Sequence, residues 1–411
     1  MKFNKPSQLL LVSLIGLVLA SLLTACQLVT LDYVYVACSA GNSPGSAGQI
    51  YSYAVDSQSG ALRIGQKTVS SGGTNPVALA VTSNYYHLYA ANRGNNSVVH
   101  FSIELSGALT QKESVTLPVA PVALAVNSAN TYLYVLSGTN SATLSEYPID
   151  KNGVIGSVAA TQTLALSGNY SSDTIVPTAL TVLADSSAVY ATVYDKSAYN
   201  PGGSTTSNAN PGWVFGYLVG SNGALTAVSD SPFQAGVKPS AIATDPVSRF
   251  VYVTDYASNE LIGYSATALR GTSLDRSLNF MVNGPFKTGD EPTSVTVDPR
   301  GLYIYLTNSL DSSVSAYSIT LQNGTPSTVV NATSSAGNGT DTEPVSVVVE
   351  PALGRFVYTA NYLGNSISGF RLTPETGALS INQATPYPTG AYPTALVAVP
   401  HGNHSTESVT P

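Results

Sequence analysis

The stretch Pro76-Val-Ala-Leu-Ala-Val is repeated along the chain and decides its fold. It recurs unchanged from Pro121. A proline followed by a run of small or apolar residues recurs five more times, at Pro177, Pro239, Pro292, Pro344 and Pro393. We call these seven positions the starter prolines. They lie 45 to 62 residues apart, a spacing typical of repeat architectures.

Each of the first six starter prolines is followed, about ten residues later, by a tyrosine-rich strand such as Phe250-Val-Tyr-Val-Thr254. A third strand such as Ser97–Phe101 and a turn such as Ser106-Gly-Ala-Leu109 then lead to a fourth strand. Glycine at such a turn supplies the positive φ of a tight hairpin. No segment after Cys26 shows helical periodicity, so the sequence predicts an all-β propeller of four-stranded antiparallel blades. A linked array of β-sandwiches is the alternative.

The two ends of the repeat region predict the number of blades. Leu31–Val36 has the pattern of a second strand without a first, and Pro393–Val399 that of a first strand without a second. Together they complete one blade, and six whole repeats supply the others. We therefore expect one seven-bladed β-propeller over residues 31–399, whose closure removes free sheet edges. The polar tail, residues 400–411, is expected to be flexible.

Charge is scarce in this chain. It has 411 residues, of which 9% are charged, against roughly 25% in typical soluble domains. A net charge of −7 argues against a nucleic-acid partner, which needs clustered Lys and Arg. Two cysteines exclude a disulfide framework and a zinc–cysteine site, and four histidines leave little material for a metal centre. We expect no cofactor.

The N-terminal segment has the pattern of a targeting signal. Lys2 and Lys5 precede the apolar run Leu9–Leu23, and Leu23-Thr-Ala-Cys26 resembles the bacterial lipobox, in which the cysteine is acylated. The run is shorter than the ~20 residues of a membrane-spanning helix. We expect residues 1–25 to be a signal peptide, Cys26 to be lipidated, and residues 26–30 to tether an exported lipoprotein to the membrane, at the periplasmic face or cell surface. The alternatives are an ordinary signal peptide and an N-terminal membrane helix.

The geometry of a propeller points to a candidate ligand site. The innermost strand begins and the second strand ends at the same face, which we call the mouth. The residues just before the starter prolines are Asn75, Ala120, Val176, Lys238, Glu291, Glu343 and Tyr392. The residues just after the second strands are Ser39, Arg93, Gly138, Tyr194, Tyr256, Ser309 and Tyr362.

Several of these residues carry useful chemistry. The candidate ligand-binding residues are Arg93, Tyr194, Tyr256, Tyr362, Lys238, Asp255, Glu291 and Glu343. Because the chain has so few charged residues, their convergence at one face indicates a ligand site there. A cation among tyrosines suits an acidic or sugar-like small molecule, and an envelope protein is a further possible partner. The alternative is that these are polar loop residues that keep the surface soluble.

Other segments near the mouth stand out. Two insertions, residues 195–212 and 331–343, are longer than ordinary connections and are expected at this face. Three starter prolines are preceded by an eight-residue motif that carries an aromatic residue, Phe233, Phe286 or Tyr387. We expect this aromatic side chain to pack between blades.

On the starter prolines, the strand Arg355–Asn361 and the Gly-Ala-Leu turn, the sequence resembles the seven-bladed lactonase family. That family includes propeller-type 6-phosphogluconolactonases and carboxymuconate lactonizing enzymes. The sequence equally resembles surface repeat proteins named after a Tyr-Val-Thr-Asn strand. The resemblance covers nearly all of residues 31–399 and implies the fold strongly, but catalysis weakly.

Of three catalytic signatures that the resemblance implies, one is matched, by Asn92-Arg-Gly94. A Pro-His-x-His start is absent, because the starter prolines are followed by Val77, Val122, Thr178, Ser240, Thr293, Val345 and Thr394. A Gly-Pro-Arg-His start, with a glutamate closing the next strand, is also absent. Arg93 could stabilise an oxyanion, and only Asp255, Glu291 and Glu343 could activate water.

Two functions therefore stay open. The missing signatures favour a binding or scaffold module, held at the cell envelope by its lipid, and no catalytic residue is assigned. The alternative is a lactonase, similar to a 6-phosphogluconolactonase, with an altered catalytic set.

Overall fold

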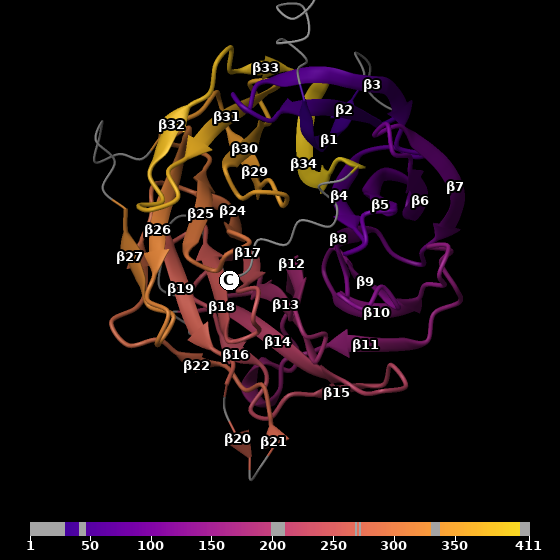
Figure 1. Cartoon of the computed structure of the whole chain (residues 1–411). Coiled ribbons are helices and arrows are strands. Elements are labelled where there is room, and N and C mark those ends of the chain that lie inside the picture. The colour runs from indigo at the N-terminus through magenta and orange to yellow at the C-terminus, as the bar shows by residue number, and fades with distance from the viewer. Residues whose placement is uncertain are drawn as a thin grey trace, which may run out of the picture.

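A computed structural model of the chain describes residues 29–40, 47–198, 210–267, 269–270, 273–329 and 338–402. Its strands form seven blades around a central axis (Figure 1), which confirms the predicted all-β, seven-bladed propeller. The described ranges hold two short 3-10 helices, η1 (Arg93–Asn95) and η2 (Gly168–Tyr170). No helix in these ranges is long and apolar enough to cross a membrane.

The innermost strand of each blade begins at or just before a starter proline. From blade 1 to blade 7 these strands are β4 (Pro76–Val81), β8 (Pro121–Val126), β12 (Ile175–Val182), β17 (Pro239–Thr244), β24 (Pro292–Val297), β29 (Pro344–Val349) and β34 (Ala391–Pro400). The second strands are β5 (His87–Asn92), β9 (Tyr132–Ser137), β13 (Ala188–Asp195), β18 (Phe250–Asp255), β25 (Tyr303–Asn308), β30 (Phe356–Asn361) and β1 (Thr30–Ala40).

The third strands are β6 (Ser97–Ile103), β10 (Ala142–Pro148), β14 (Gly212–Val219), β19 (Glu260–Ser265), β26 (Ser313–Ile319), β31 (Ser366–Leu372) and β2 (Gln49–Asp56). Continuous outer strands occur in blades 1, 2 and 7, as β7 (Leu109–Thr116), β11 (Ala160–Leu164) and β3 (Leu62–Ser70).

In blades 3 to 6 the outer strand is broken into two short pieces, so four uniform strands per blade are not found there. The pieces are β15 (Leu225–Ala227) and β16 (Phe233–Gln234), β22 (Asn279–Phe280) and β23 (Phe286–Lys287), β27 (Pro326–Thr328) and β28 (Asn338–Gly339), and β32 (Leu379–Ile381) and β33 (Tyr387–Pro388). A small hairpin, β20 (Leu269–Arg270) and β21 (Ser273–Leu274), projects from blade 4.

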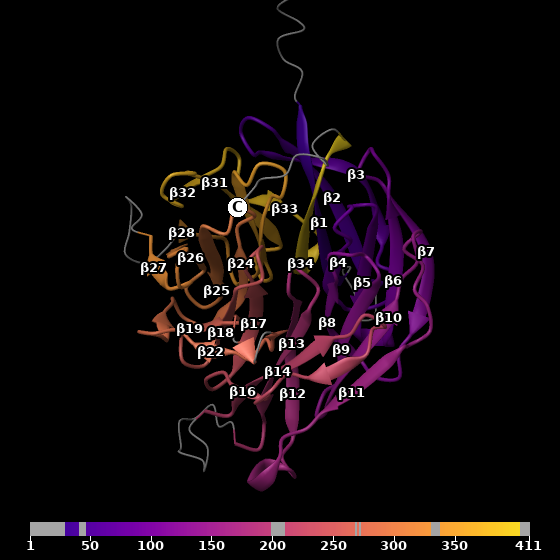
Figure 2. The same ribbon diagram turned by 60° about the horizontal axis from the view of Figure 1, so that its bottom comes forward.

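The ring closes in blade 7, where the two ends of the repeat region meet. Strand β1 pairs antiparallel with β34 from Asp32↔Pro400 to Ala40↔Ala391. The yellow β34 accordingly lies beside the indigo β1 (Figures 1 and 2). The predicted shared blade is confirmed, and β34 extends to Pro400, one residue beyond the predicted end. The backbone N–H of His401 also donates to the carbonyl of Leu31 at 2.9 Å.

The hydrophobic core is divided among the interfaces between blades. Each of seven buried clusters joins side chains from two neighbouring blades. The motif aromatics take part as expected, since Phe233 shares a buried cluster with Ile262 of blade 4 and Tyr387 shares one with Tyr53 of blade 7. A blade therefore buries its apolar faces only when both neighbours are present.

A tyrosine near the centre of the second strand joins neighbouring blades at six of the seven interfaces. In six interfaces its hydroxyl donates to the backbone carbonyl of the turn before the outer strand of the next blade, which we call the tyrosine latch. The latches are Tyr35–Gly107, Tyr89–Gly153, Tyr190–Arg276, Tyr252–Gly324, Tyr305–Gly377 and Tyr358–Gly60, at 2.6 to 2.9 Å. All six acceptor residues have positive φ, which explains the glycine of the Gly-Ala-Leu turn.

The interface between blades 2 and 3 departs from this pattern. Opposite the latch tyrosine, the third strand carries Ser, His, Gly or Ala in other blades, but Glu146 lies opposite Tyr134. Glu146 is fully buried. Neither its carboxyl oxygens nor the Tyr134 hydroxyl has a well-aligned hydrogen-bond partner among the described residues. Burial raises the pKa of Glu146 to about 7, because the charged form is poorly solvated there.

Glu146 is expected to make the stability of the propeller pH-dependent. Its pKa is higher in the folded chain than its ordinary value of 4.5, so the folded state retains the proton more strongly. The resulting stabilisation is complete below about pH 4.5 and is lost as the pH rises through about 7. Thermal unfolding of Glu146→Gln, compared with wild type between pH 5 and 8, should show a Tm difference that grows with pH in favour of the variant. A constant difference would contradict this prediction.

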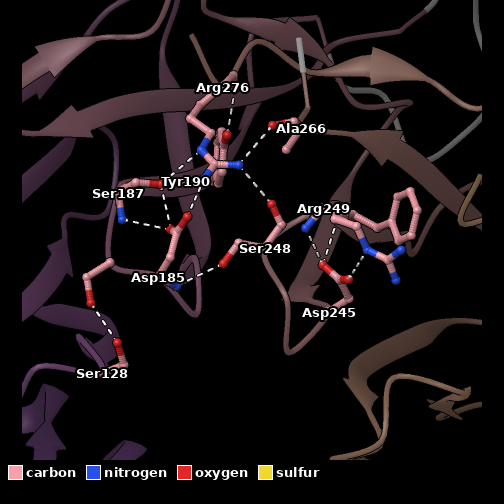
Figure 3. A network of polar contacts seen from close by, with 11 residues as sticks. Ser128, Asp185, Ser187, Tyr190, Asp245, Ser248, Arg249, Ala266 and Arg276 are labelled. Carbon is pink, nitrogen blue, oxygen red and sulfur yellow. Dashed lines mark hydrogen bonds and ion pairs between the residues drawn. The ribbon is translucent and has the colours of Figure 1, made fainter. Parts of the chain in front are cut away.

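On the face opposite the mouth, Arg276 connects blades 3 and 4 (Figure 3). It occupies the turn position that holds glycine in the other latches and is only 5% exposed. Its guanidinium donates to Ser187 Oγ at 2.9 Å, to the carbonyls of Ser248 and Ala266 at 2.9 and 3.3 Å, and to Asp185. These bonds fix the first turn of blade 3 against that of blade 4.

Candidate functional site

The two rings predicted to meet at the mouth lie side by side in the backbone. The N–H of the residue after a second strand donates to the carbonyl of the residue before the starter proline in five blades. The pairs are Arg93–Asn75, Gly138–Ala120, Tyr256–Lys238, Ser309–Glu291 and Tyr362–Glu343, at 2.7 to 2.9 Å. In blade 3 the strand register sets Tyr194 opposite Val176, and in blade 7 Ser39 Oγ donates to the carbonyl of Tyr392.

Lys238 is the centre of the best-formed cluster at the mouth. Its ammonium lies 4.1 Å from the ring centroid of Tyr256 in its own blade and 5.9 Å from that of Tyr194 in the preceding blade. All three side chains are half-buried. Burial lowers the pKa of Lys238, and the Glu291 carboxylate from the following blade opposes that shift. The structure thus brings together four candidate residues from three consecutive blades.

Asp255 holds the loop that carries Lys238. It is fully buried, and its carboxylate accepts the backbone N–H groups of Val237 at 2.6 Å and of Lys238 at 2.9 Å. Two further N–H groups, from Ala257 and Ser258, approach the same carboxylate. Asp255 therefore fixes the loop that carries Lys238, and its oxygens are engaged by backbone.

The other candidates lie elsewhere on the mouth. The Tyr362 ring lies 5.1 Å from that of Tyr392, next to the half-buried Glu343 on blade 6. Arg93 is exposed on blade 1, at the start of η1, and within the described part of the chain its guanidinium makes no hydrogen bond or ion pair. No contact in the described residues joins Arg93 or Tyr362 to the Lys238 cluster.

A backbone feature of the mouth could not be read from the sequence. Four of the seven residues before the starter prolines have left-handed φ values: Asn75 (51°), Glu291 (56°), Glu343 (58°) and Tyr392 (55°). This conformation is uncommon for side chains other than glycine and asparagine. Glu291 and Glu343 are thus held in strained backbone at the same face as Lys238, as is common at functional sites.

In the Pro-His-x-His signature, histidine follows a starter proline. In this chain, residues at that position connect neighbouring blades. Three hydroxyl side chains that follow starter prolines donate to the carbonyl of the next blade's starter proline. These bonds are Ser240–Pro292, Thr293–Pro344 and Thr394–Pro76, at 2.6 to 2.8 Å. They connect the innermost strands, so any water-activating group must come from another position.

The strand histidines also lie away from the mouth. His87 begins β5, and its Nδ1 lies 3.0 Å from Nε2 of His100, whose Nδ1 lies 3.0 Å from Glu113. The Glu113 carboxylate accepts the N–H of Ile155 in blade 2. This chain of contacts joins blades 1 and 2. Within the described residues, no group of three or more His, Cys, Asp or Glu side chains could hold a metal ion.

A closed seven-bladed propeller is the fold that the resemblance to the lactonase family implies. The sequence model of the family described as "Lactonase, 7-bladed beta-propeller" matches residues 33–174 and 234–404. The chain belongs to this family, which confirms the resemblance found in the sequence. Residues 175–233, which include most of blade 3, lie outside the match.

Individual relatives are distant. The 6-phosphogluconolactonase of Pectobacterium atrosepticum is 25% identical over 349 residues, which are 84% of this chain and 92% of that protein. The 6-phosphogluconolactonase of Sodalis glossinidius is 36% identical over 131 residues, 32% of this chain and 36% of that protein. The periplasmic gluconolactonase PpgL of Pseudomonas aeruginosa has a TM-score of 0.71 at 16% identity, covering 91% of this chain and all of that structure, which shows a shared fold.

Proposed function

We propose that this protein hydrolyses lactones of sugar acids at the Lys238 cluster of the propeller mouth. Membership of the lactonase family and the names of its relatives support this reaction class. The observation that carries the proposal is the half-buried Lys238 between Tyr194 and Tyr256, with the Glu291 carboxylate beside it.

The chemistry needs two groups. A water molecule attacks the lactone carbonyl, the ring C–O bond breaks, and a hydroxy acid is released. Lys238 stabilises the oxyanion that forms on the carbonyl oxygen, because an ammonium shielded from bulk water interacts strongly with developing negative charge. Glu291 takes the proton from the attacking water and gives it to the ring oxygen that leaves when the C–O bond breaks. The tyrosine rings cover the C–H surface of the sugar.

Replacement of Lys238 by Met should lower kcat/KM for lactone hydrolysis by about 10²-fold, the usual effect of losing one oxyanion donor. Glu291→Gln should lower it by about 10²-fold or more, because the base is lost. The measurement is alkali uptake with glucono-δ-lactone and with its 6-phosphate, each corrected for spontaneous hydrolysis. Lys67→Ala, which removes an exposed lysine of β3, is the matched control and should keep full activity. Wild type no faster than the spontaneous rate would refute the proposal.

A binding module is the second candidate function, because the histidine and Arg-His positions of the family hold other residues. On this alternative, sugar acids and lactones shift the thermal unfolding of the protein without being hydrolysed. Arg93→Ala should then weaken binding of an acidic ligand by about tenfold or more with little change in Tm, since its exposed guanidinium loses a charge-assisted contact. A lower Tm with no ligand response would make Arg93 a structural residue.

We also propose that the protein is an exported lipoprotein held at a bacterial membrane. The support for this is the Leu23-Thr-Ala-Cys26 sequence, which lies outside the described residues. The Cys26→Ala protein should remain unprocessed or be released from the membrane, because one thiol is the only proposed acylation point. Detergent partitioning and the intact mass of the two proteins test this. Unchanged mass and membrane attachment in the variant would refute lipidation.

A further inference from the structure

Blade 3 carries an acidic pair next to the mouth, where the stretch that matches the family ends. Strand β13 continues two residues beyond the residue opposite its starter proline, Val193, and ends at Asp195, which pairs with Ile175. Burial raises the pKa of the Asp195 carboxyl, and Asp173, in the segment that leads into β12, lies close enough to raise it further. Asp195 lies outside the stretches that match the family.

One oxygen of Asp195 is satisfied and the other is not. Oδ1 accepts the backbone N–H groups of Ser197 at 2.8 Å and of Ala198 at 3.3 Å. Oδ2 is buried, since the residue is 0% exposed, and no N–H or O–H group of the described residues donates to it. The group that acts on it is the carboxylate of Asp173. Two facing carboxylates in a buried setting repel each other unless a proton or a cation lies between them.

No basic side chain of the described residues compensates this pair. The adjacent Lys196 directs its ammonium to Asn140 Oδ1 at 3.1 Å, on blade 2. Besides burial, the groups that act on the Asp195 carboxyl are Asp173 and the backbone N–H groups of Ser197 and Ala198. Asp255 makes a useful comparison, because both oxygens of its buried carboxylate accept hydrogen bonds from backbone N–H groups.

We infer that Asp195 and Asp173 bind a divalent cation of the calcium class. Calcium prefers oxygen ligands, tolerates irregular coordination, and commonly combines few carboxylates with backbone carbonyls and water. Only two carboxylates are available, so the expected dissociation constant is that of weak sites, about 0.1–1 mM. The ion would join the segment before β12 to the end of β13, next to Tyr194 at the mouth.

The single tryptophan of the chain lies on the same blade as this site and can report on a bound ion by luminescence. This residue, Trp213, lies opposite Val193 on the neighbouring strand, and its ring is 6.2 Å from that of Tyr170. Asp195 and Val193 share a face of β13, because side chains alternate along a strand. Trp213 therefore lies on the face of blade 3 that carries Asp195. A terbium ion bound there in place of calcium should luminesce on excitation of the tryptophan.

The first test is thermal unfolding of metal-free protein with and without calcium. At about 10 mM Ca²⁺ the Tm of the wild type should rise by about 2–4 °C, because an ion that binds only the folded state stabilises it by mass action. Asp195→Asn and Asp173→Asn should lose this shift, and Asp195→Asn retains the Oδ1 bonds that shape the turn. Asp230→Asn, which alters an exposed carboxylate of the same blade, should keep it.

The second test locates the ion. Terbium luminescence excited on the red edge of absorption, where tyrosine contributes little, should appear in wild type and be displaced by calcium. Trp213→Phe should lose the luminescence but retain the calcium-dependent rise in Tm. A rise that persists in both Asn variants would place the ion elsewhere and overturn the inference. No ion response in wild type, with Asp195→Asn flattening the pH dependence of Tm, would show that the pair shares a proton instead. Neither measurement depends on lactone hydrolysis.

Discussion

A chain that ends at Gly390, and so lacks β34, is expected to lose cooperative folding and to aggregate. Without β34, β1 keeps a partner on one side only, and the innermost strands β4 and β29 lose the strand between them. The bond from Thr394 Oγ1 to the carbonyl of Pro76, which joins blade 7 to blade 1, is also lost. Two buried clusters open at once, because Leu396 belongs to one and Val399 to the other.

The matched control is a chain that ends at Gly402. It keeps all of β34 and the bond from His401 to Leu31, so its unfolding transition should match that of wild type. Thermal unfolding followed by circular dichroism, with size-exclusion chromatography, distinguishes the two chains. Soluble, cooperatively unfolding protein from the shorter chain would contradict closure by the shared blade.

The blade pattern was predictable because each repeat needs the same types of residue at the same structural positions. A starter proline fixes the beginning of an innermost strand, and a tyrosine at the centre of the second strand is needed for the latch. These features recur in sequence order, so Pro239 and Tyr252 alone indicate where blade 4 lies along the chain. The meeting of Lys238 with Tyr256 follows from the same register, since both residues flank a paired proline and strand end.

Contacts between blades could not be predicted in the same way. Nothing in the sequence near Lys238 indicates that Tyr194, 44 positions earlier, would lie against its ammonium, because the twist between blades decides that contact. The left-handed backbone at Glu291 was also unpredictable, since glutamate rarely adopts it. Asp255 was selected as a ligand-binding candidate from its charge, whereas its oxygens are engaged by the loop of Lys238.

The role of Arg276 in a tyrosine latch could not be predicted from the sequence either. Residues 266–281 lack a Gly-Ala-Leu turn, yet the Arg276 carbonyl completes a latch with Tyr190 at 2.6 Å and its φ is 60°. An arginine in this backbone conformation is strained by comparison with glycine. The side chain offsets that strain by reaching between two blades (Figure 3), where its guanidinium makes four hydrogen bonds to carbonyl, hydroxyl and carboxylate acceptors.

Replacing Arg276 by Ala is expected to lower the free energy of unfolding by about 2–4 kcal/mol. The carbonyls of Ser248 and Ala266 lose a buried charged donor, whereas Asp185, which is 43% exposed, is partly resolvated by water. Arg276→Gly should cost about 1 kcal/mol less than Arg276→Ala, because glycine accepts a positive φ without strain. Urea unfolding at neutral pH measures both variants, and Arg63→Ala, an exposed arginine of β3, is the control with a change below about 0.5 kcal/mol. A loss of similar size in Arg63→Ala and Arg276→Ala would show that the guanidinium bonds between blades 3 and 4 contribute little, and that the tyrosine latch alone holds that interface.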